Sequence, residues 1–575
     1  MAKSIKEAMQ HAEDLVHDYA NQKKLMKKMD EMYFMDWKGD KPDESKMKFT
    51  PSPMPRNALL GAIRLMTSTE PTFNVPFDAN RSDAKAISEK IERICNAIWY
   101  HSGRFRGVPL EQPAVESMLR YGMMCLAITD TEDLVALMKD RGSSKAQQMQ
   151  VERVLRSTPY LIEAWDPKSV YPEFNRFGLN SIFRTVTMTV AEVKAQFGDK
   201  KVMNVIKDID SENERVAYAD YWDLEKHMAW IIATIGGGER VIGGEPIIDE
   251  KHDLPCIPIV VQTSEGSYMD SDREYQAIPF LYGVEKGKLW ERQNLELSYL
   301  YTNLFYLAAN PTFIHETPSE EGLEFDTSVP GKAVRLRPGE QFYQLEKNVV
   351  NRDMMTGLDI AEKLVEESTI YSQALGGTGR LGANAAFSTV SLLHQAGRLP
   401  LISPQKRGGW GISTAMEYIF EMIKDKKQKG RAKTDDGSVL DFQADEIPDD
   451  LIIKAHLEVD MPQDMLAQAN IAQLITQSGL ASNRWVREHI LNIGQSDEME
   501  KEVWTEGASR QMYQEFLAMM MQANMMQEAG MPPEQAQGAP MPPEEHEIAD
   551  PAMRAQAGLV PPMGPGHMPG EDMGL

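Results

Sequence analysis

Apolar residues in the first part of the chain recur at intervals of three to four positions, the spacing that places them on one face of a helix. This pattern predicts a helix over Lys6–Met35. Three prolines between residues 51 and 55 interrupt the pattern. We expect helices to resume over Asn57–Ser68, Ser82–Ser102 and Glu111–Tyr121.

A section with strand-like patterns comes next. Short apolar or alternating segments, bounded by turn residues, predict β-strands here, and a charged segment between the first two, Thr131–Arg156, looks helical and exposed. Because helices and strands are mixed without strict alternation, we expect an α+β body. The predicted strands are Met124–Thr129, Tyr160–Trp165, Ser181–Thr189, Glu214–Trp222, His227–Ile235 and Ile257–Gln262.

Two long helical segments of similar length bracket a compact β module. The first, Glu285–Ala309, would be roughly 37 Å long, and the second, Met354–Leu375, about 33 Å. Between them lie three strand-like pieces, Thr312–His315, Ala333–Arg337 and Gln341–Leu345. This layout favours a small module held on a two-helix stalk.

The chain then changes character. A glycine-rich stretch, residues 376–384, precedes a predicted helix over Ala385–Ala396, which Leu399-Pro400 should bend. We further predict a helix over Ser413–Lys424, a polar loop over Gly430–Asp441, a strand over Leu451–Val459 and four helices between Met465 and Gln527. Met531–Leu575 holds 10 Pro and 6 Gly and almost no aliphatic clusters, so we expect it to be disordered.

Composition narrows the class of protein. With 575 residues, the chain is long enough for two to four modules. A net charge of −25 repels nucleic acid on average, which argues against an ordinary DNA-binding protein. No apolar run approaches the length of a membrane span, and we see no signal peptide. Cys95, Cys125 and Cys256 form no CxxC pair and read as core residues.

One motif could bind a nucleotide. Gly377–Gly382 matches G-x-G-x-x-G, but a dinucleotide site needs a strand before the motif and an acidic residue about 20 positions after it. A predicted helix precedes it here, and no acidic residue follows at that distance, so a flexible loop is the favoured interpretation. His227, His252 and His315 are too scattered to predict a metal site.

Basic residues are scarce enough to locate individually. Each group could contact phosphate, although ion pairs or a solvated face are the commoner roles. The groups are Lys332, Arg335 and Arg337 in the bracketed module, Arg380 in the glycine-rich stretch, Lys406-Arg407, and residues 424–433.

The order of these parts resembles the portal (head-to-tail connector) proteins of tailed bacteriophages. Local phrases agree: residues 165–172 (WDPKSVYP), 387–390 (FSTV), 482–493 (SNRWVREHILNI) and 496–500 (SDEME) are similar to phrases of that family. The resemblance implies a portal-type α+β fold with an N-terminal α/β wing (1–283), a first stem helix (284–310), a β-containing clip (311–353), a second stem helix (354–375), a tunnel loop (376–384), a wing return (385–461), a helical wing or crown (462–530) and a disordered tail (531–575).

The resemblance also implies a function. Twelve copies would form a ring at one capsid vertex of the virion, assembled in the host cytoplasm. Double-stranded DNA would pass through it without sequence specificity. The implied partners are the major capsid protein, the large terminase subunit and a head–tail adaptor, with no membrane. Thr378 and Arg380 would be the DNA-channel residues, and Lys332, Arg335 and Arg337 basic candidates on the clip. No catalytic residue, cofactor or metal is expected.

Two other classes stay open. The chain could be another virion structural protein or an ejected internal protein, which predicts an extended or monomeric particle. It could also be an enzyme that binds a nucleotide at Gly377–Gly382, which predicts saturable nucleotide binding and a strand before Gly376.

Overall fold

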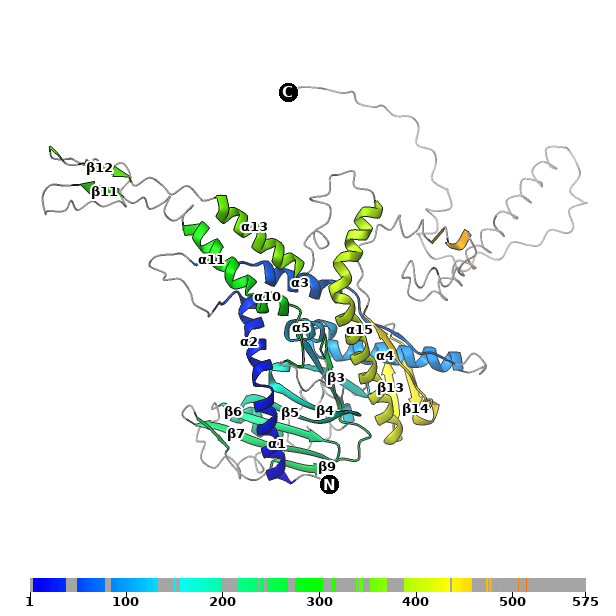
Figure 1. Ribbon diagram of the computed structural model, residues 1–575. Helices are drawn as coiled ribbons and strands as arrows, with labels where there is room; N and C mark the ends of the chain where they lie inside the picture. Colours follow the sequence, from blue (N-terminus) through cyan, green and yellow to red (C-terminus); the bar gives the residue numbers. More distant parts are fainter. Residues whose placement is uncertain are drawn as a thin grey trace, which may run out of the picture. The chain divides into compact units, whose positions relative to one another are not determined.

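The computed structural model mixes helices and strands, as the pattern predicts (Figure 1). It divides into two compact units, Met1–Met461 and Pro462–Leu575. The structure describes residues 4–37, 49–77, 84–132, 156–197, 215–235, 238–241, 246–266, 275–302, 313–316, 338–339, 341–344, 352–369, 387–434 and 437–457, together with positions 149, 152, 472, 473, 475–477, 486, 505 and 513. Nearly all of the described residues therefore belong to the first unit.

The largest sheet has six strands and is antiparallel throughout. Five of its strands follow one another in both chain order and sheet order, and the sixth pairs with the fourth of these five. The predicted strands over 181–189, 214–222 and 227–235 are confirmed, whereas β4, β8 and β9 were not predicted. The strands are β4 (Val170–Asn175), β5 (Gly178–Thr189), β6 (Arg215–Asp223), β7 (Lys226–Ile235), β8 (Gly238–Val241) and β9 (Ile248–Lys251).

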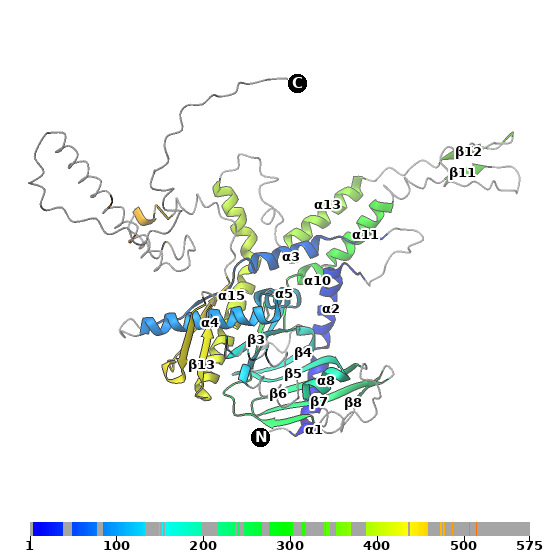
Figure 2. The ribbon, with the colours of Figure 1, turned by 180° about the vertical axis from the view of Figure 1, so that it is seen from behind.

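Each face of this sheet carries a helix. Alternation along the strands sends Tyr221 and Trp230 to one face, where they pack on α1 (Ile5–Asp18). It sends Tyr218 and Ile231 to the other face, where they pack on α8 (Val190–Phe197). Both helices can be followed in Figure 2. The N-terminal helical prediction holds, except that Tyr19 separates α1 from α2 (Ala20–Phe34).

A second, three-stranded sheet lies at the centre of the main core. Its order is β10-β2-β3, again antiparallel, and β2 is buried on both faces. The predicted helices over 57–68, 82–102 and 111–121 are confirmed, and they pack around this sheet with α15. The elements are β2 (Met123–Asp130), β3 (Tyr160–Trp165), β10 (Ile259–Thr263), α3 (Met54–Met66), α4 (Ala84–Arg106) and α5 (Glu111–Tyr121). The segment predicted to be helical between β2 and β3 lies largely outside the described residues.

The segment predicted as a polar loop, Gly430–Asp441, is instead most of a β-hairpin. Strand β13 (Lys429–Lys433) pairs antiparallel with β14 (Val439–Gln443). A Cβ atom at Gly430 would lie only 2.0 Å from the ring of Phe442. Because glycine has no Cβ atom, the ring of Phe442 on β14 can lie over Gly430 on β13. The prediction was wrong because it took the glycine and charges as loop signals. Downstream, β15 (Lys454–His456) confirms the predicted strand in a shorter form and pairs with β1 (Thr72–Asn74).

One continuous helix, α15 (Phe387–Asp425), replaces the two helices predicted on either side of Leu399-Pro400. It passes through Pro400 and Pro404 although proline cannot donate the helical hydrogen bond. Its middle is buried against β10, β2 and β15, including Leu401 and Ile412. Tertiary packing therefore outweighs the helix-breaking residues on which the prediction relied.

Three glycines let α15 approach the strands closely. A methyl group at Gly409 would lie 2.5 Å from the carbonyl oxygen of Ala455 in β15. One at Gly411 would lie 2.6 Å from Met124 of β2, and one at Gly408 would lie 2.8 Å from Leu457. Real side-chain carbons do not approach other atoms so closely, so the helix can occupy this position only where side chains are missing.

A buried arginine ties the N-terminal helices to the core. Arg120 of α5 lies 2.7 Å from Asp30 of α2 and 3.0 Å from Glu116, and its guanidinium stacks 3.8 Å from the ring centre of Tyr33. Asp30 also accepts a hydrogen bond from Tyr121 at 2.7 Å. A buried guanidinium held by two carboxylates is costly to break, so this cluster fixes α2 against α5.

We predict that Gly409→Ala destabilises the protein by about 1–3 kcal/mol, because the added methyl group meets a backbone carbonyl that cannot turn aside. The matched control is Gly357→Ala in the helix α13 (Arg352–Glu367), where the methyl group would lie an ordinary 3.5 Å from Glu296. That substitution should stabilise the helix by roughly 0.5–1 kcal/mol. Thermal unfolding of both variants tests the contrast, and equal melting temperatures would contradict it.

Stability should also respond to acid through His101. Its Nε2 donates to the carbonyl of Lys433 at 2.6 Å, and burial lowers the pKa of the imidazole below its ordinary 6.5. In the window below 6.5 the unfolded chain then binds more protons than the folded one, so stability falls as the pH falls. His101→Asn cannot titrate. We expect the difference in melting temperature between wild type and His101→Asn to change between pH 7.5 and 5, and a constant difference would contradict the assignment.

Candidate functional site

The element predicted as the first long helix is broken near its start. A short helix, α10 (Tyr282–Lys286), ends at Gly287, and Lys288 adopts a left-handed backbone conformation before α11 (Leu289–Tyr301) begins. The ammonium of Lys288 lies 2.9 Å from Glu285 and 3.4 Å from Glu291, which holds the break together. The expected helix over Glu285–Ala309 is thus divided by this break, and α11 begins only at Leu289. Positions 303–312, where the predicted helix would end, lie outside the described residues.

The second long helix is α13, and it lies beside α11 (Figure 1). It begins two residues earlier than predicted and ends at Glu367 rather than Leu375, since Ser368 and Thr369 leave the helix. Gly283 lies near Ser368, and Gly357 lies near Glu296, so the two helical segments are antiparallel. Between them in sequence, β11 (Phe313–Glu316) pairs antiparallel with β12 (Gln341–Gln344), which confirms the outer two of the three predicted strand pieces.

One face of α11 binds an extended segment of the backbone before α3. Ser298 Oγ accepts from the amide of Thr50 at 3.0 Å, and Asn294 Oδ1 accepts from the amide of Ser52 at 2.7 Å. One turn earlier, Trp290 Nε1 donates to the carbonyl of Ser52 at 3.0 Å. These three buried side chains are four residues apart, so they form one polar row along the helix. The row fixes the helix pair to the core, and its four-residue spacing is visible in the sequence, although no role was predicted for it.

The helix pair also exposes apolar residues. On α11, Leu295 and Tyr299 are exposed one turn apart, and we call them the α11 stripe. On α13, Ile360 and Leu364 are exposed with the same spacing, and we call them the α13 stripe. Since each helix already buries its other face, the two stripes are exposed apolar surfaces that are suited to contact other molecules.

The residues proposed from the sequence for DNA and partner contacts lie outside the described residues. Thr378 and Arg380, together with the Gly377–Gly382 motif, fall in the interval 370–386, and Lys332, Arg335 and Arg337 fall in the interval 317–337. Their roles therefore stay predictions.

Several of the other basic residues are engaged within the chain. Arg407 donates to Thr263 Oγ1 at 3.0 Å and to the carbonyl of Gly266 at 2.8 Å. Lys426 lies 2.6 Å from Asp130, and Arg431 lies 2.8 Å from Asp441. These three residues therefore have intrachain partners.

Two of the three histidines considered as metal ligands, and the buried Cys125, have surroundings that the fold explains. His227 Nε2 lies 2.7 Å from Asp220, and its ring stacks 3.8 Å from that of Trp222. His252 Nε2 lies 2.8 Å from the carbonyl of Asp223. Cys125 is buried, which raises the pKa of its thiol to about 12. In the part of the chain that the structure describes, no three His, Cys, Asp or Glu side chains gather as a metal site, and no helix is long and apolar enough to cross a membrane.

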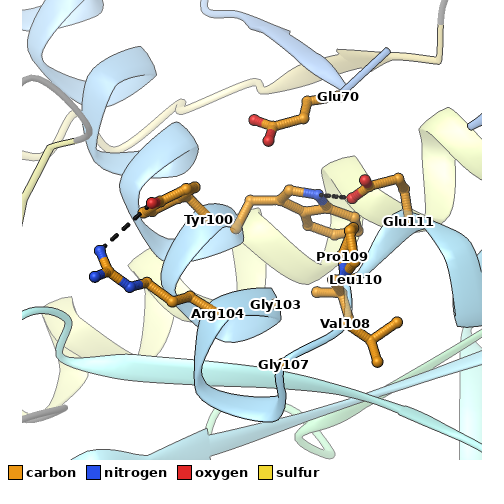
Figure 3. A pocket seen from close by; sticks show the side chains of 10 residues that line it. Glu70, Tyr100, Gly103, Arg104, Gly107, Val108, Pro109, Leu110 and Glu111 are labelled. Carbon is orange, nitrogen blue, oxygen red and sulfur yellow. Dashed lines mark hydrogen bonds between the residues drawn. The ribbon is translucent and has the colours of Figure 1, made fainter. Parts of the chain in front are cut away.

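A pocket of about 440 Å³ opens beside the last turns of α4 (Figure 3). Trp99 Nε1 donates to Glu111 Oε2 at 3.1 Å, and Arg104 donates to the hydroxyl of Tyr100 at 3.4 Å. The described lining holds no serine, cysteine, lysine or histidine that could serve as a nucleophile or a base beside these groups. The carboxylates of Glu70 and Glu111 also line the pocket.

Comparisons with known proteins give only distant similarity. No family model matches the chain, and no curated protein matches it. Among solved structures, it is similar to the neck of a native gene transfer agent particle computed with C12 symmetry (9% identity, 76% of this chain and 89% of that chain, TM-score 0.35). It is also similar to the neck of an empty gene transfer agent particle computed with C6 symmetry (11%, 76% and 89%, TM-score 0.37) and to the virion of a native particle (11%, 79% and 96%, TM-score 0.34). Similarity this low does not assign the chain to a family.

We predict that Asn294→Ala loosens the segment before α3, because the buried amide of Ser52 loses its acceptor at a cost of about 1–3 kcal/mol. Hydrogen exchange at the amides of Thr50 and Ser52 should become faster. The control, Arg292→Ala, changes an exposed residue of the same helix and should leave both rates nearly unchanged. Unchanged exchange in Asn294→Ala would contradict the role of the polar row.

Proposed function

We propose that the chain is a portal-type subunit: a non-enzymatic protein that assembles into a twelve-membered ring at a capsid vertex and lets double-stranded DNA pass. The observation that carries this proposal is the antiparallel pair of α11 and α13, fixed to the core by one face and exposing an apolar stripe on each helix. In this proposal the pair is the stem, and the module between the two helices is the clip.

The stripes suit a head-to-tail contact. When the α11 stripe of one copy packs on the α13 stripe of the next, two different surfaces meet, which is the kind of contact that closes into a ring. Burying each of these Leu, Ile or Tyr side chains contributes about 1.5–3 kcal/mol before ordering costs.

Charge would govern how DNA moves through such a ring. With −25 per chain, twelve copies carry about −300 formal charges, so few phosphates are neutralised and DNA is held weakly. Thr378 and Arg380 are the proposed contacts of the tunnel loop, and Lys332, Arg335 and Arg337 the proposed basic residues of the clip. The proposed partners are the capsid protein, the large terminase subunit and an adaptor, with the ATPase of the terminase supplying the energy.

We expect the purified chain to form rings of about 778 kDa, twelve times 64.8 kDa, with a central hole in negative-stain electron micrographs. The double variant Tyr299→Asp, Leu364→Asp places a charge in both stripes and should yield folded monomers by mass photometry. Val439→Asp alters an equally exposed apolar residue of β14 and should leave the rings intact. An elongated rod or a compact dimer for the wild type would contradict the ring, and rings of the double variant would contradict the stripes.

A further inference from the structure

A second surface of the molecule has the chemistry of a binding groove. It lies between the middle of α15 and the segment 451–457 that contains β15, and it encloses about 650 Å³. It shares no lining residue with the pocket beside α4 or with the helix pair. Its wall on α15 includes Ile402, Lys406 and Trp410, which are four residues apart and so lie along one side of the helix.

The groove exposes large apolar side chains. Trp410 is 55% exposed, Ile402 is 51% exposed and Ile452, on the opposite wall, is 56% exposed. Folded chains seldom leave three such side chains at the edge of one concave surface unless another molecule covers them. Tryptophan in particular is enriched among the residues that dominate the binding energy of protein interfaces.

The charge of the groove is opposite to that of the chain. Lys406, Lys454 and His456 line it, against a single carboxylate, Glu417, although the whole chain carries −25. The ammonium of Lys406 lies 5.2 Å from the ring centre of Trp410, and within the described part of the chain neither lysine forms an ion pair. Glu417 accepts from the amide of Ile453 at 3.0 Å, and burial raises the pKa of its carboxyl.

The backbone of β15 cannot accept another strand here. One of its edges pairs with β1. On the other edge, Ser413 Oγ accepts from the amide of Ala455 at 2.7 Å, Glu417 holds the amide of Ile453, and Gln405 donates to the carbonyl of Leu457. Any molecule in the groove must therefore be recognised through side chains and not through strand addition.

We propose that this groove binds an acidic, apolar segment of a partner protein. Apolar side chains of the segment pack on Trp410, Ile402 and Ile452, and its carboxylates pair with Lys406 and Lys454. A carboxylate-rich segment is favoured over an anionic membrane, because the chain as a whole repels anionic surfaces beyond the reach of this local patch. The proposal does not depend on ring assembly or on the portal function.

The test is a selection from a random peptide display library with the full-length protein as bait, followed by titration of the selected synthetic peptides by fluorescence anisotropy. We expect the selected peptides to be enriched in Asp or Glu together with Leu, Phe or Met. We expect Trp410→Ala and the double variant Lys406→Glu, Lys454→Glu each to weaken their binding about tenfold or more. Because all three side chains are exposed, these variants should retain the wild-type melting temperature.

Matched controls are Leu224→Ala, which removes an equally exposed apolar side chain from the β6–β7 turn, and Lys429→Glu on β13. Both should bind the selected peptides like the wild type. The proposal is overturned if selection on the wild type enriches no peptide beyond those enriched by selection on Trp410→Ala, or if the enriched peptides are basic. It is also overturned if Trp410→Ala instead dissociates an assembly of the wild type, which would make a second copy the occupant, or abolishes binding to phosphatidylserine vesicles.

Discussion

The close approach of α15 to the strands around it is the constraint on which the rest of the first unit depends. Gly408, Gly409 and Gly411 remove the side chains that would hold the helix away from β2, β15 and Leu457. The helix can then seal the main core, in which α4, α5 and the three-stranded sheet also take part. Since α15 contains two prolines, exposed Pro400 and buried Pro404, packing against neighbours must supply the stability that local propensity does not.

Side chains of two helices, far apart in sequence, hold extended backbone in the same way. Trp290, Asn294 and Ser298 of α11 bind the backbone at Thr50 and Ser52. Gln405, Ser413 and Glu417 of α15 bind alternate residues of the segment that contains β15. In both places side chains of a helix satisfy backbone groups on an edge that no strand covers, as is needed if those groups are to stay buried. The helix pair and the groove are thereby held on rigid supports.

The sequence predicted regular elements well where one signal was unopposed. Local patterns were sufficient there: alternation predicted β5, β6 and β7, and helical periodicity predicted α4 and α5, without knowledge of long-range contacts. Predictions failed where contacts between distant residues determine the structure. A loop was predicted at Gly430, but Phe442 packs over this glycine in a β-hairpin. A bend was predicted at Pro400, but α15 stays continuous and packs on β10. At the candidate site, the two helices were predicted, but the break at Lys288 was not. The groove was not predicted either, because its two walls are about 50 residues apart in the chain.

The opposite directions of α11 and α13 have a consequence for how such a protein can change over evolutionary time. The last turn of α11 and the first turn of α13 lie at the same end of the pair, so the chain leaves and returns at neighbouring points. Whatever connects them closes a loop whose entropic cost rises by only about 0.6 kcal/mol for each doubling of its length. Residues 303–351 can therefore be lengthened, shortened or exchanged between relatives with little penalty to the core, which allows the contacts made by this insertion to diversify independently of the scaffold that carries it.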